Sequence, residues 1–411
     1  MTWPRRFAAA ALVLVIPKWN EPCNAQVYEV QDSAGIAVVT TAPNPGAAPW
    51  LISKEPVITI GKVEGEQPYL FTQIWDALRT PDGRIVVVEG SAYEIRVFGR
   101  EGRHLATFGG RGGGPNEFGG PPWIALAGSD TVVVWDPGHL RISHYSLDGE
   151  LLSQHIIRSL LDSLAIRPFP NGLVWRIARD GSLLWTGQGR ARREPQRVTA
   201  STSRFVLIPP DRTGIRDLGE YADGQTSYAE RSGGGLAGMA SPFAPSSTAA
   251  LGPTPDHVAI SDSQRWEIRF FDGLGRLRKI WRGRFPRAPV TPAMVAAARR
   301  ENTAAASRLG LTRKQAEEVF GRIPMPDSVP AIGVMIWDAA GNFWIGTRAG
   351  KHREISEYQV LDQHGRWLST VIMPSGLGQI FDIGADYLLA EKQDEVGVQY
   401  LQMYRIRKPA R

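Results

Sequence analysis

Residues 74–88 read IWDALRTPDGRIVVV, a sequence of apolar run, turn and second apolar run that other parts of the chain repeat. The turn contains Asp82-Gly83, a dipeptide that tolerates the positive φ angles of a tight hairpin. The same order recurs as VWRIARDGSLLW at 174–185 and as VMIWDAAGNFWI at 334–345. Each copy predicts two antiparallel strands, and recurrence at a long period indicates a repeat architecture.

A second hairpin follows the first in several copies. The turn glycines Gly102 and Gly149 lie 47 residues apart (149 − 102), a period that fits a four-stranded propeller blade. We count six such units. They cover roughly 73–110, 122–157, 172–220, 245–283, 333–373 and 378–407.

The last unit has only three clear strands, and the N-terminal side supplies a fourth. Residues 56–60, Pro-Val-Ile-Thr-Ile, form a predicted strand without a unit of its own. Pairing this strand with the last unit would close a ring and remove an exposed sheet edge. The sequence therefore predicts an all-β fold, a six-bladed β-propeller over residues 50–408 closed by an N-terminal strand, preceded by an N-terminal extension at 26–49.

One segment, 291–321, breaks the β pattern between the fourth and fifth blades. Thr291-Pro292 is typical of a helix start, and Gly310 is typical of a helix end. Thr312 and Gln315 have the spacing of a capping box for a second short helix. We expect a small helical insertion packed against one face of the ring. A lid over the channel is the alternative that the sequence leaves open.

The chain has 13 tryptophans, and several fall on the predicted strands. Trp135, Trp185 and Trp344 lie on second strands of their units. Both faces of a blade are buried between neighbours, so large flat side chains are suited to fill the gaps. We expect these rings to form core rather than an aromatic ligand cage.

The first 25 residues are typical of a signal peptide. Arg5 and Arg6 precede an apolar run of ten residues at 7–16, and ten helical residues span only about 15 Å, half of a bilayer's hydrocarbon thickness. Cys23-Asn24-Ala25 provides a small-x-small cleavage site. Cleavage after Ala25 removes the single cysteine, and no later stretch is a membrane span. We therefore expect an exported protein, periplasmic or extracellular.

Composition excludes several other classes. Hydrophobic residues make up 43% of the chain, enough to fill a core, which excludes a disordered protein. A single cysteine excludes a disulfide framework. The net charge of +6 arises without any run of five basic residues, so we predict no nucleic-acid partner.

The first two blades carry residues that resemble the NHL-type six-bladed propellers, in particular exported bacterial members. In these blades the resembling residues are Val97-Phe98, Gly102, the stretch FGGRGGGPNEF at 108–118 and PPWIAL at 121–126. The closing stretch VQYLQMYRI at 398–406 resembles the last strand of that family. The resemblance covers about residues 50–408 and implies the propeller fold. It carries over no catalytic or metal-binding residue.

No recognised catalytic motif is present in the sequence. G-x-S-x-G, H-E-x-x-H and EF-hand patterns are absent. The Gly-rich stretch at 109–114 leads through Pro115 and Phe118 into a strand, whereas a phosphate loop leads into a helix N-terminus. We interpret the stretch as a turn between blades.

Polar groups on the first strands remain as candidates, because first strands line the channel of a propeller. Asp76, Arg176 and Asp382 occupy matching places in three units. They could cap strand ends, bind channel water, pair with one another, or hold a polar ligand. We predict no bound cofactor, and a divalent cation in the channel stays open.

Two functions fit these observations. The first is a monomeric binding or scaffold module that presents its rim or channel mouth to a protein, peptide or glycan ligand. The alternative is a metal-assisted hydrolase or lyase of the propeller lactonase type, working in the channel through Asp76 and Asp382. The sequence leaves open whether the protein is an enzyme.

Overall fold

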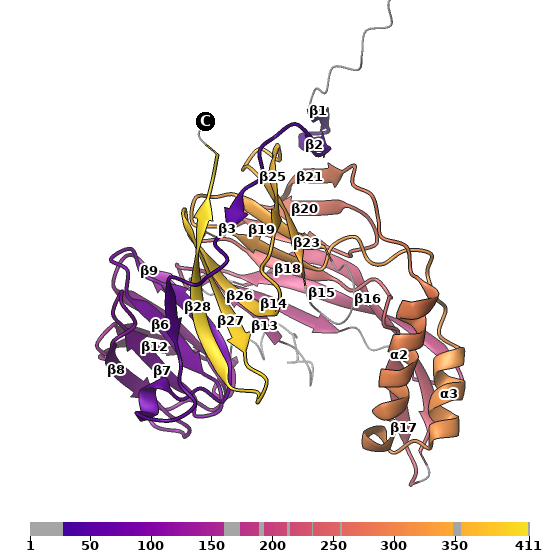
Figure 1. The fold of residues 1–411 in the computed structure, drawn as a ribbon, viewed down its shortest axis with the longest axis horizontal. Helices are drawn as coiled ribbons and strands as arrows, with labels where there is room; N and C mark the ends of the chain where they lie inside the picture. Colours follow the sequence, from indigo (N-terminus) through magenta and orange to yellow (C-terminus); the bar gives the residue numbers. More distant parts are fainter. Residues whose placement is uncertain are drawn as a thin grey trace, which may run out of the picture.

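The computed structural model describes residues 28–159, 173–188, 193–211, 214–231, 233–254, 257–347 and 355–409. The signal peptide predicted at 1–25 lies outside these residues. Strands dominate the described part (Figure 1). No helix within it has the length and apolarity needed to cross a membrane.

Six sheets make up the strand structure of the described residues, and three of them have four antiparallel strands in chain order. Sheet I comprises β5 (Ile74–Arg79), β6 (Ile85–Glu89), β7 (Glu94–Phe98) and β8 (His104–Gly109). Sheet II comprises β9 (Trp123–Ala127), β10 (Thr131–Asp136), β11 (Arg141–Ser146) and β12 (Leu151–Ile156). Sheet V comprises β22 (Val334–Trp337), β23 (Phe343–Thr347), β24 (Glu357–Leu361) and β25 (Trp367–Ile372).

The other three sheets carry additional strands. Sheet III comprises β13 (Leu173–Ile177), β14 (Leu183–Gln188), β15 (Val198–Ile208), β16 (Arg216–Glu230) and β17 (Leu236–Ala240). Sheet IV has β18 (Thr248–Leu251), β19 (Val258–Ser261), β20 (Glu267–Phe271), β21 (Leu277–Gly283), β1 (Tyr28–Ser33) and β2 (Ile36–Thr41). Sheet VI has β26 (Leu377–Ile383), β27 (Tyr387–Gln393), β28 (Gln399–Arg407), β3 (Leu51–Ile52) and β4 (Ile58–Ile60).

The first strands of successive sheets contact one another. β26 contacts β5, β5 contacts β9, β9 contacts β13, β13 contacts β18, and β18 contacts β22. Just after β22, Ala339 donates its backbone N–H to the carbonyl oxygen of Ile383 at the end of β26, at 2.8 Å. The inner strands therefore follow one another in the manner of a β-propeller.

Residues 28–60 run along the outer strands of three sheets. β1 and β2 form a hairpin, and β2 pairs in parallel with β21 of sheet IV. Trp50 forms a bridge with Val371 of sheet V. Both β3 and β4 pair with β28 of sheet VI. The segment expected to be an extension at 26–49 thus contains strand of its own, and β4 lies within the strand predicted at 56–60.

The core lies between neighbouring sheets. Trp135 of sheet II and Trp185 of sheet III pack edge to face with ring centroids 6.5 Å apart. Trp135, Trp185 and Trp344 are only 1%, 3% and 0% exposed, which confirms that these tryptophans belong to the core. Burying each ring stabilises the fold by several kcal/mol, at about 25 cal/mol per Å² of apolar surface.

The helices lie on an extension of sheet III. β15 and β16 form a hairpin of 11 and 15 residues, so the predicted end of the third unit at residue 220 was wrong. α2 (Pro292–Ala304), η2 (Ala306–Leu309) and α3 (Arg313–Gly321) follow sheet IV in the chain. α3 contacts β16 and β17, and Figure 1 shows the helices beside β17, away from sheets I and II. We call residues 225–240 and 291–323 the helical lobe.

The predicted caps of these helices are confirmed. Thr291 accepts a hydrogen bond from the Met294 N–H at 3.3 Å, and Gly310 ends η2 in the left-handed conformation with φ of 70°. Thr312 and Gln315 form the capping box on α3. A buried cluster of Ala316, Val319 and Phe320 with residues of β16, β17 and α2 then holds the helices on the hairpin.

Candidate functional site at the inner strands

Three inner strands contain a β-bulge just before a charged residue. In β5 the register shifts between Ile74 and Asp76, in β13 between Val174 and Arg176, and in β26 between Ile380 and Asp382. A bulge adds one residue to a strand and changes the direction of the following side chain. Asp76, Arg176 and Asp382, which sequence alone placed at matching positions, therefore share one local backbone irregularity.

Asp76 connects sheet I to sheet II. Its Oδ1 accepts a hydrogen bond from the Ala77 N–H at 3.0 Å, and its Oδ2 accepts one from the Ile124 N–H of β9 at 3.1 Å. The residue is only 5% exposed. Both carboxylate oxygens thus accept backbone N–H groups, one from their own strand and one from the neighbouring sheet.

Asp382 connects sheet VI to sheet I in the same way. Its Oδ2 accepts hydrogen bonds from the Arg79 N–H of β5 at 2.9 Å and from the Tyr387 hydroxyl of β27 at 2.7 Å. The Arg79 guanidinium lies 4.8 Å from the centre of the Tyr387 ring. The carboxylate, the phenol and the guanidinium form one packed group on the inner strands.

Arg176 brings a third sheet to the same place. Its Nη1 lies 4.0 Å from Oδ1 of Asp76, although β9 stands between β5 and β13 in the order of the inner strands. Its guanidinium also lies 5.1 Å from the centre of the Trp123 ring. An interaction between non-neighbouring sheets is possible only where the inner strands converge. We call Asp76, Arg79, Arg176, Asp382 and Tyr387 the central cluster.

Burial dominates the electrostatics of the central cluster. Burial raises the pKa of Asp76 from 3.8 to about 6; the charge of Asp382 adds to the rise, while Arg176 and the two N–H donors oppose it. Burial also raises the pKa of Asp382, against the hydrogen bonds from Tyr387 and Arg79 and the charge of Arg179. Water is a better solvent for a carboxylate than this interior, so protonation is favoured.

Two arginines bring positive charge to the solvent-facing side of this region. The Arg176 side chain is 34% exposed, whereas the Asp76 side chain is 7% exposed. Arg179, in the turn after β13, is exposed as well. The region can therefore present guanidinium groups and the Trp123 ring to a ligand, while its carboxylates stay engaged with the backbone.

Three members of this region, Asp76, Arg176 and Asp382, could be predicted from the sequence, and four were not predicted. Arg79, Arg179, Trp123 and Tyr387 belong to it by their contacts. Arg79 and Arg179 follow Asp76 and Arg176 by three residues, a spacing that the matching units already contained. Tyr387 carried no comparable signal, because its role depends on the neighbouring strand β26.

Metal-ligand geometry was tested over the described residues. Within them, no three His, Cys, Asp or Glu side chains lie close enough to hold a metal ion together. The His139 side chain bonds through Nδ1 to Oδ2 of Asp136 at 2.6 Å. Asp136 also accepts bonds from Arg141 and from the Gly119 and Gly138 N–H groups, and it thereby fixes the loop before sheet II.

Comparison with known proteins gives structural likenesses only. No family model and no curated protein matches the chain. A protein of Bacteroides fragilis assigned as exported is 12% identical, with a TM-score of 0.48 over 90% of this chain and 100% of that one. A catalytically inactive virginiamycin B lyase from Staphylococcus aureus is 11% identical, with a TM-score of 0.37 over 92% and 99%. A gluconolactonase from Xanthomonas campestris is 14% identical, with a TM-score of 0.33 over 82% and 88%.

These likenesses are too distant to assign a family or an activity. The resemblance to the NHL-type propellers therefore stays a prediction.

Proposed function

We propose that the chain is an exported six-bladed β-propeller of the NHL type and that it acts as a binding module. In this proposal β4 closes the ring by pairing with β28, and the central cluster lies at the convergence of the blades. The ligand carries an acidic group, as in an acidic glycan or an acidic segment of a peptide or protein. The contacts between successive inner strands support the ring, and the sequence at 1–25 supports export.

One observation carries the choice of ligand. Oδ2 of Asp76 and Oδ2 of Asp382 each accept a backbone N–H of a neighbouring sheet, whereas Arg176 exposes a third of its side chain. A guanidinium binds a carboxylate through two parallel hydrogen bonds, which gives direction as well as strength. The Trp123 ring beside it offers a flat apolar surface on which a sugar ring or a peptide unit can lie.

The test uses acidic probes and matched variants. Tetragalacturonate and a hexaglutamate peptide are titrated calorimetrically into the full mature chain, next to a neutral galactose tetramer. We expect the protein to bind an acidic probe and not the neutral one, and Arg176→Ala to weaken binding at least tenfold. Arg103→Ala, an equal loss of charge at an exposed turn of sheet I, should leave the affinity unchanged.

Two results would overturn the proposal. One is the absence of binding by either acidic probe at millimolar concentration. The other is an equal effect of Arg176→Ala and Arg103→Ala, which would mean that overall charge and not the central cluster attracts the probe.

The metal-assisted alternative stays a prediction with its own test. Protein purified without chelator would be analysed for metal, and its melting temperature measured with added Ca²⁺ or Zn²⁺. A rise in melting temperature that Asp76→Asn abolishes would favour the alternative over the binding module.

A further inference from the structure

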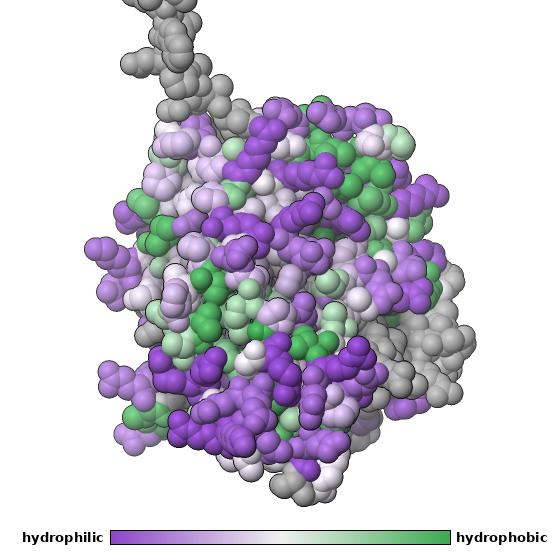
Figure 2. Space-filling view, turned by 90° about the vertical axis from the view of Figure 1, so that its right-hand side faces the viewer, coloured by the Kyte–Doolittle hydropathy of each residue, from purple (hydrophilic) through white to green (hydrophobic). Residues whose placement is uncertain are grey.

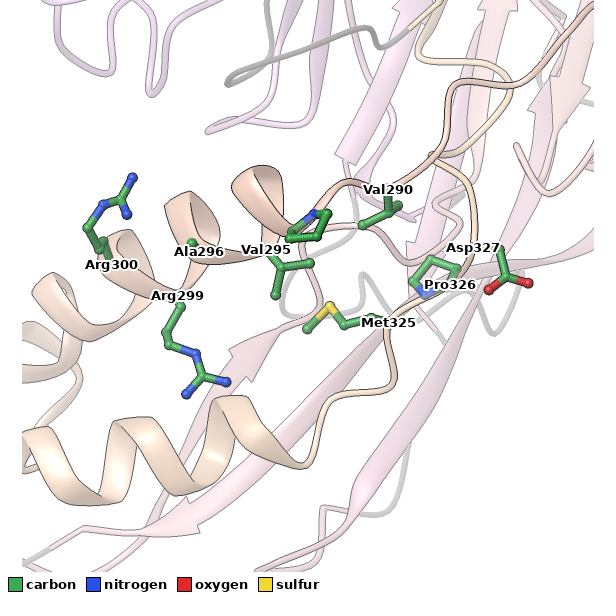
Figure 3. Close-up of a pocket in the computed structure, with 9 residues that line it drawn as sticks. Val290, Val295, Ala296, Arg299, Arg300, Met325, Pro326 and Asp327 are labelled. Atoms are coloured by element: carbon green, nitrogen blue, oxygen red, sulfur yellow. The ribbon is translucent and has the colours of Figure 1, made fainter.

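A second concave surface lies in the helical lobe, on a different part of the fold from the central cluster. It is a cavity of about 700 Å³ between α2 and the chain at 325–327 (Figure 3). Val290, Val295, Ala296, Met325 and Pro326 line its floor and walls. Most of these lining residues are apolar, which makes the surface an apolar groove. The side of the molecule that Figure 2 shows is largely hydrophilic, with its apolar side chains in separate areas.

The walls of the groove are fixed by backbone hydrogen bonds. The Val290 N–H donates to the Asp327 carbonyl oxygen at 3.0 Å, and the Val329 N–H donates to that of Ala288 at 3.0 Å. The strand-like contact between Pro289 and Ser328 lies between these two bonds. The two segments that flank the groove are thus held together before any ligand arrives, which lowers the entropic cost of binding.

The opposite side of the groove is held by the lobe's core. Arg322 Nη2 donates to the Tyr228 carbonyl oxygen at 3.1 Å, and Gln315 Nε2 donates to that of Glu230 at 3.0 Å. These bonds fix α3 on β16, and α2 packs on α3. Met325 supplies an unbranched side chain that adapts its shape to an apolar ligand.

Charge differs between the two ends of the groove. Arg299 and Arg300 line it at the α2 side, and both are exposed. The Arg299 guanidinium lies 5.3 Å from the centre of the Phe320 ring, so α3 holds it in place. Asp327, also exposed, lines the other end (Figure 3). A ligand that matches this surface has an apolar middle, one negative end and one positive end.

A short peptide with free termini has that distribution. The helix rises about 1.5 Å per residue, so the distance from Pro292 to Arg299 along α2 is about 10 Å. An extended peptide advances about 3.3 Å per residue, so three or four residues match the length of α2 that lines the groove. We propose that the groove binds a tri- or tetrapeptide with apolar side chains, its carboxylate at Arg299 and Arg300 and its ammonium at Asp327.

The test titrates the full mature chain with the tripeptide Ala-Leu-Val in four forms: free, N-acetylated, C-amidated and doubly capped. We expect each cap to weaken binding about three- to fivefold, the effect of one exposed ion pair. Arg300→Ala should weaken binding of the free peptide and leave binding of the amidated peptide unchanged. Asp327→Asn should weaken binding of the free peptide and leave binding of the N-acetylated peptide unchanged. Each variant removes the partner of one terminus.

Matched variants locate the site. Ala296→Trp fills the groove and should weaken binding at least tenfold, whereas Ala293→Trp, at another exposed alanine of α2, should not. Arg308→Ala, an equal loss of charge outside the groove, is the control for Arg300→Ala. Circular dichroism verifies that each variant keeps its helices.

Three outcomes would overturn the inference. One is the absence of binding of the free tripeptide at five millimolar, roughly the weakest affinity that defines a site. Ala296→Trp and Ala293→Trp could bind it alike, which would place the peptide elsewhere. Finally, decanoate could bind more tightly than any peptide and ignore Asp327→Asn, which would identify the occupant as an acyl chain with an acidic head.

Discussion

The central cluster and the helical lobe are built in opposite ways. The central cluster uses positions that repeat from sheet to sheet, and its two carboxylates accept backbone N–H groups. The helical lobe is an insertion without a repeat, and its charged groups stand at the edge of an apolar groove. In the first region charge holds strands together, and in the second apolar packing holds the elements while charge stays free for a ligand.

This difference predicts that substitutions in the two regions affect the stability of the protein in different ways. Changes at the central cluster should affect the whole fold and should depend on pH, because buried carboxylates link the sheets. Changes in the lobe should act locally and should be insensitive to pH. The buried members of the lobe's core come only from β16, β17 and residues 298–323, so its loss leaves the other cores intact.

The largest expected effect comes from truncating a buried aromatic ring in each of the two regions. Phe98→Ala in sheet I and Phe320→Ala in α3 each remove a fully buried ring, at a cost of about 3–5 kcal/mol. We expect Phe98→Ala to lower the free energy of global unfolding by that amount. Phe320→Ala should instead open the lobe, and amide hydrogen exchange should accelerate in α2, α3 and β17 alone.

The measurement is amide hydrogen exchange by mass spectrometry together with urea denaturation. Faster exchange throughout sheets I to VI in Phe320→Ala would show that the lobe and the sheets unfold as one unit. The helical lobe would then not unfold independently of the sheets.

The second effect is the pH dependence from Asp76. Its pKa is 3.8 in the unfolded chain and about 6 in the fold, so between these values the folded state binds more protons. The free energy of unfolding therefore falls as pH rises from about 4 to 6, by up to about 3 kcal/mol, and this contribution is level above that range. Asp76→Asn should remove this contribution and leave that of Asp382, whose pKa burial also raises.

Urea denaturation at half-unit pH steps between 4 and 7 measures the fall, and Asp130→Asn at an exposed position is the control. If the curves of wild type and Asp76→Asn run parallel, Asp76 titrates as an ordinary carboxylate. The central cluster would then resemble the lobe in its indifference to pH.

The hairpins of the fold could be predicted from sequence because their signals are local. Turn dipeptides such as Asp82-Gly83 and the apolar runs beside them define strands of sheets I, II and V closely. The β15–β16 hairpin was underestimated, since residues 198–230 are rich in Ser, Thr and Gly and suggest a loop. The parallel pairing of β2 with β21 joins segments about 240 residues apart, and no local pattern encodes it.

The strands that carry the candidate site could be predicted from the sequence. The groups that its side chains bond could not. The matching places of Asp76 and Asp382 in their units marked the inner strands correctly. Whether these carboxylates face a ligand or a backbone N–H depends on which donors the adjacent sheet leaves unpaired, as at Ile124 and Arg79. The groove at Ala296 was missed because its walls come from separate segments whose contact is tertiary.

A smaller effect is expected from the capping box of α3. Thr312→Ala removes the acceptor of the Gln315 N–H, a bond of 3.2 Å, and should destabilise the lobe by about 1 kcal/mol. Thr312→Ser keeps the hydroxyl and should restore most of the loss. The rate of amide hydrogen exchange in α3 measures the change. If Thr312→Ala and Thr312→Ser changed this rate equally, the hydroxyl cap would contribute nothing to the stability of the lobe.

The smallest effect on stability, and the sharpest test of the central cluster, comes from Arg176→Ala. The pair with Asp76 is 4.0 Å long and Arg176 is one-third exposed, so its removal should change the free energy of unfolding at pH 7 by only about 0.5 kcal/mol. Because the Arg176 charge lowers the pKa of Asp76, its loss should move the titration midpoint of that carboxyl upward from about 6. Carbon-13 NMR of the Asp76 carboxyl follows the midpoint directly. An unchanged midpoint would mean that Arg176 does not act on Asp76 in solution, and the convergence of sheets I and III at one site would lose its electrostatic support.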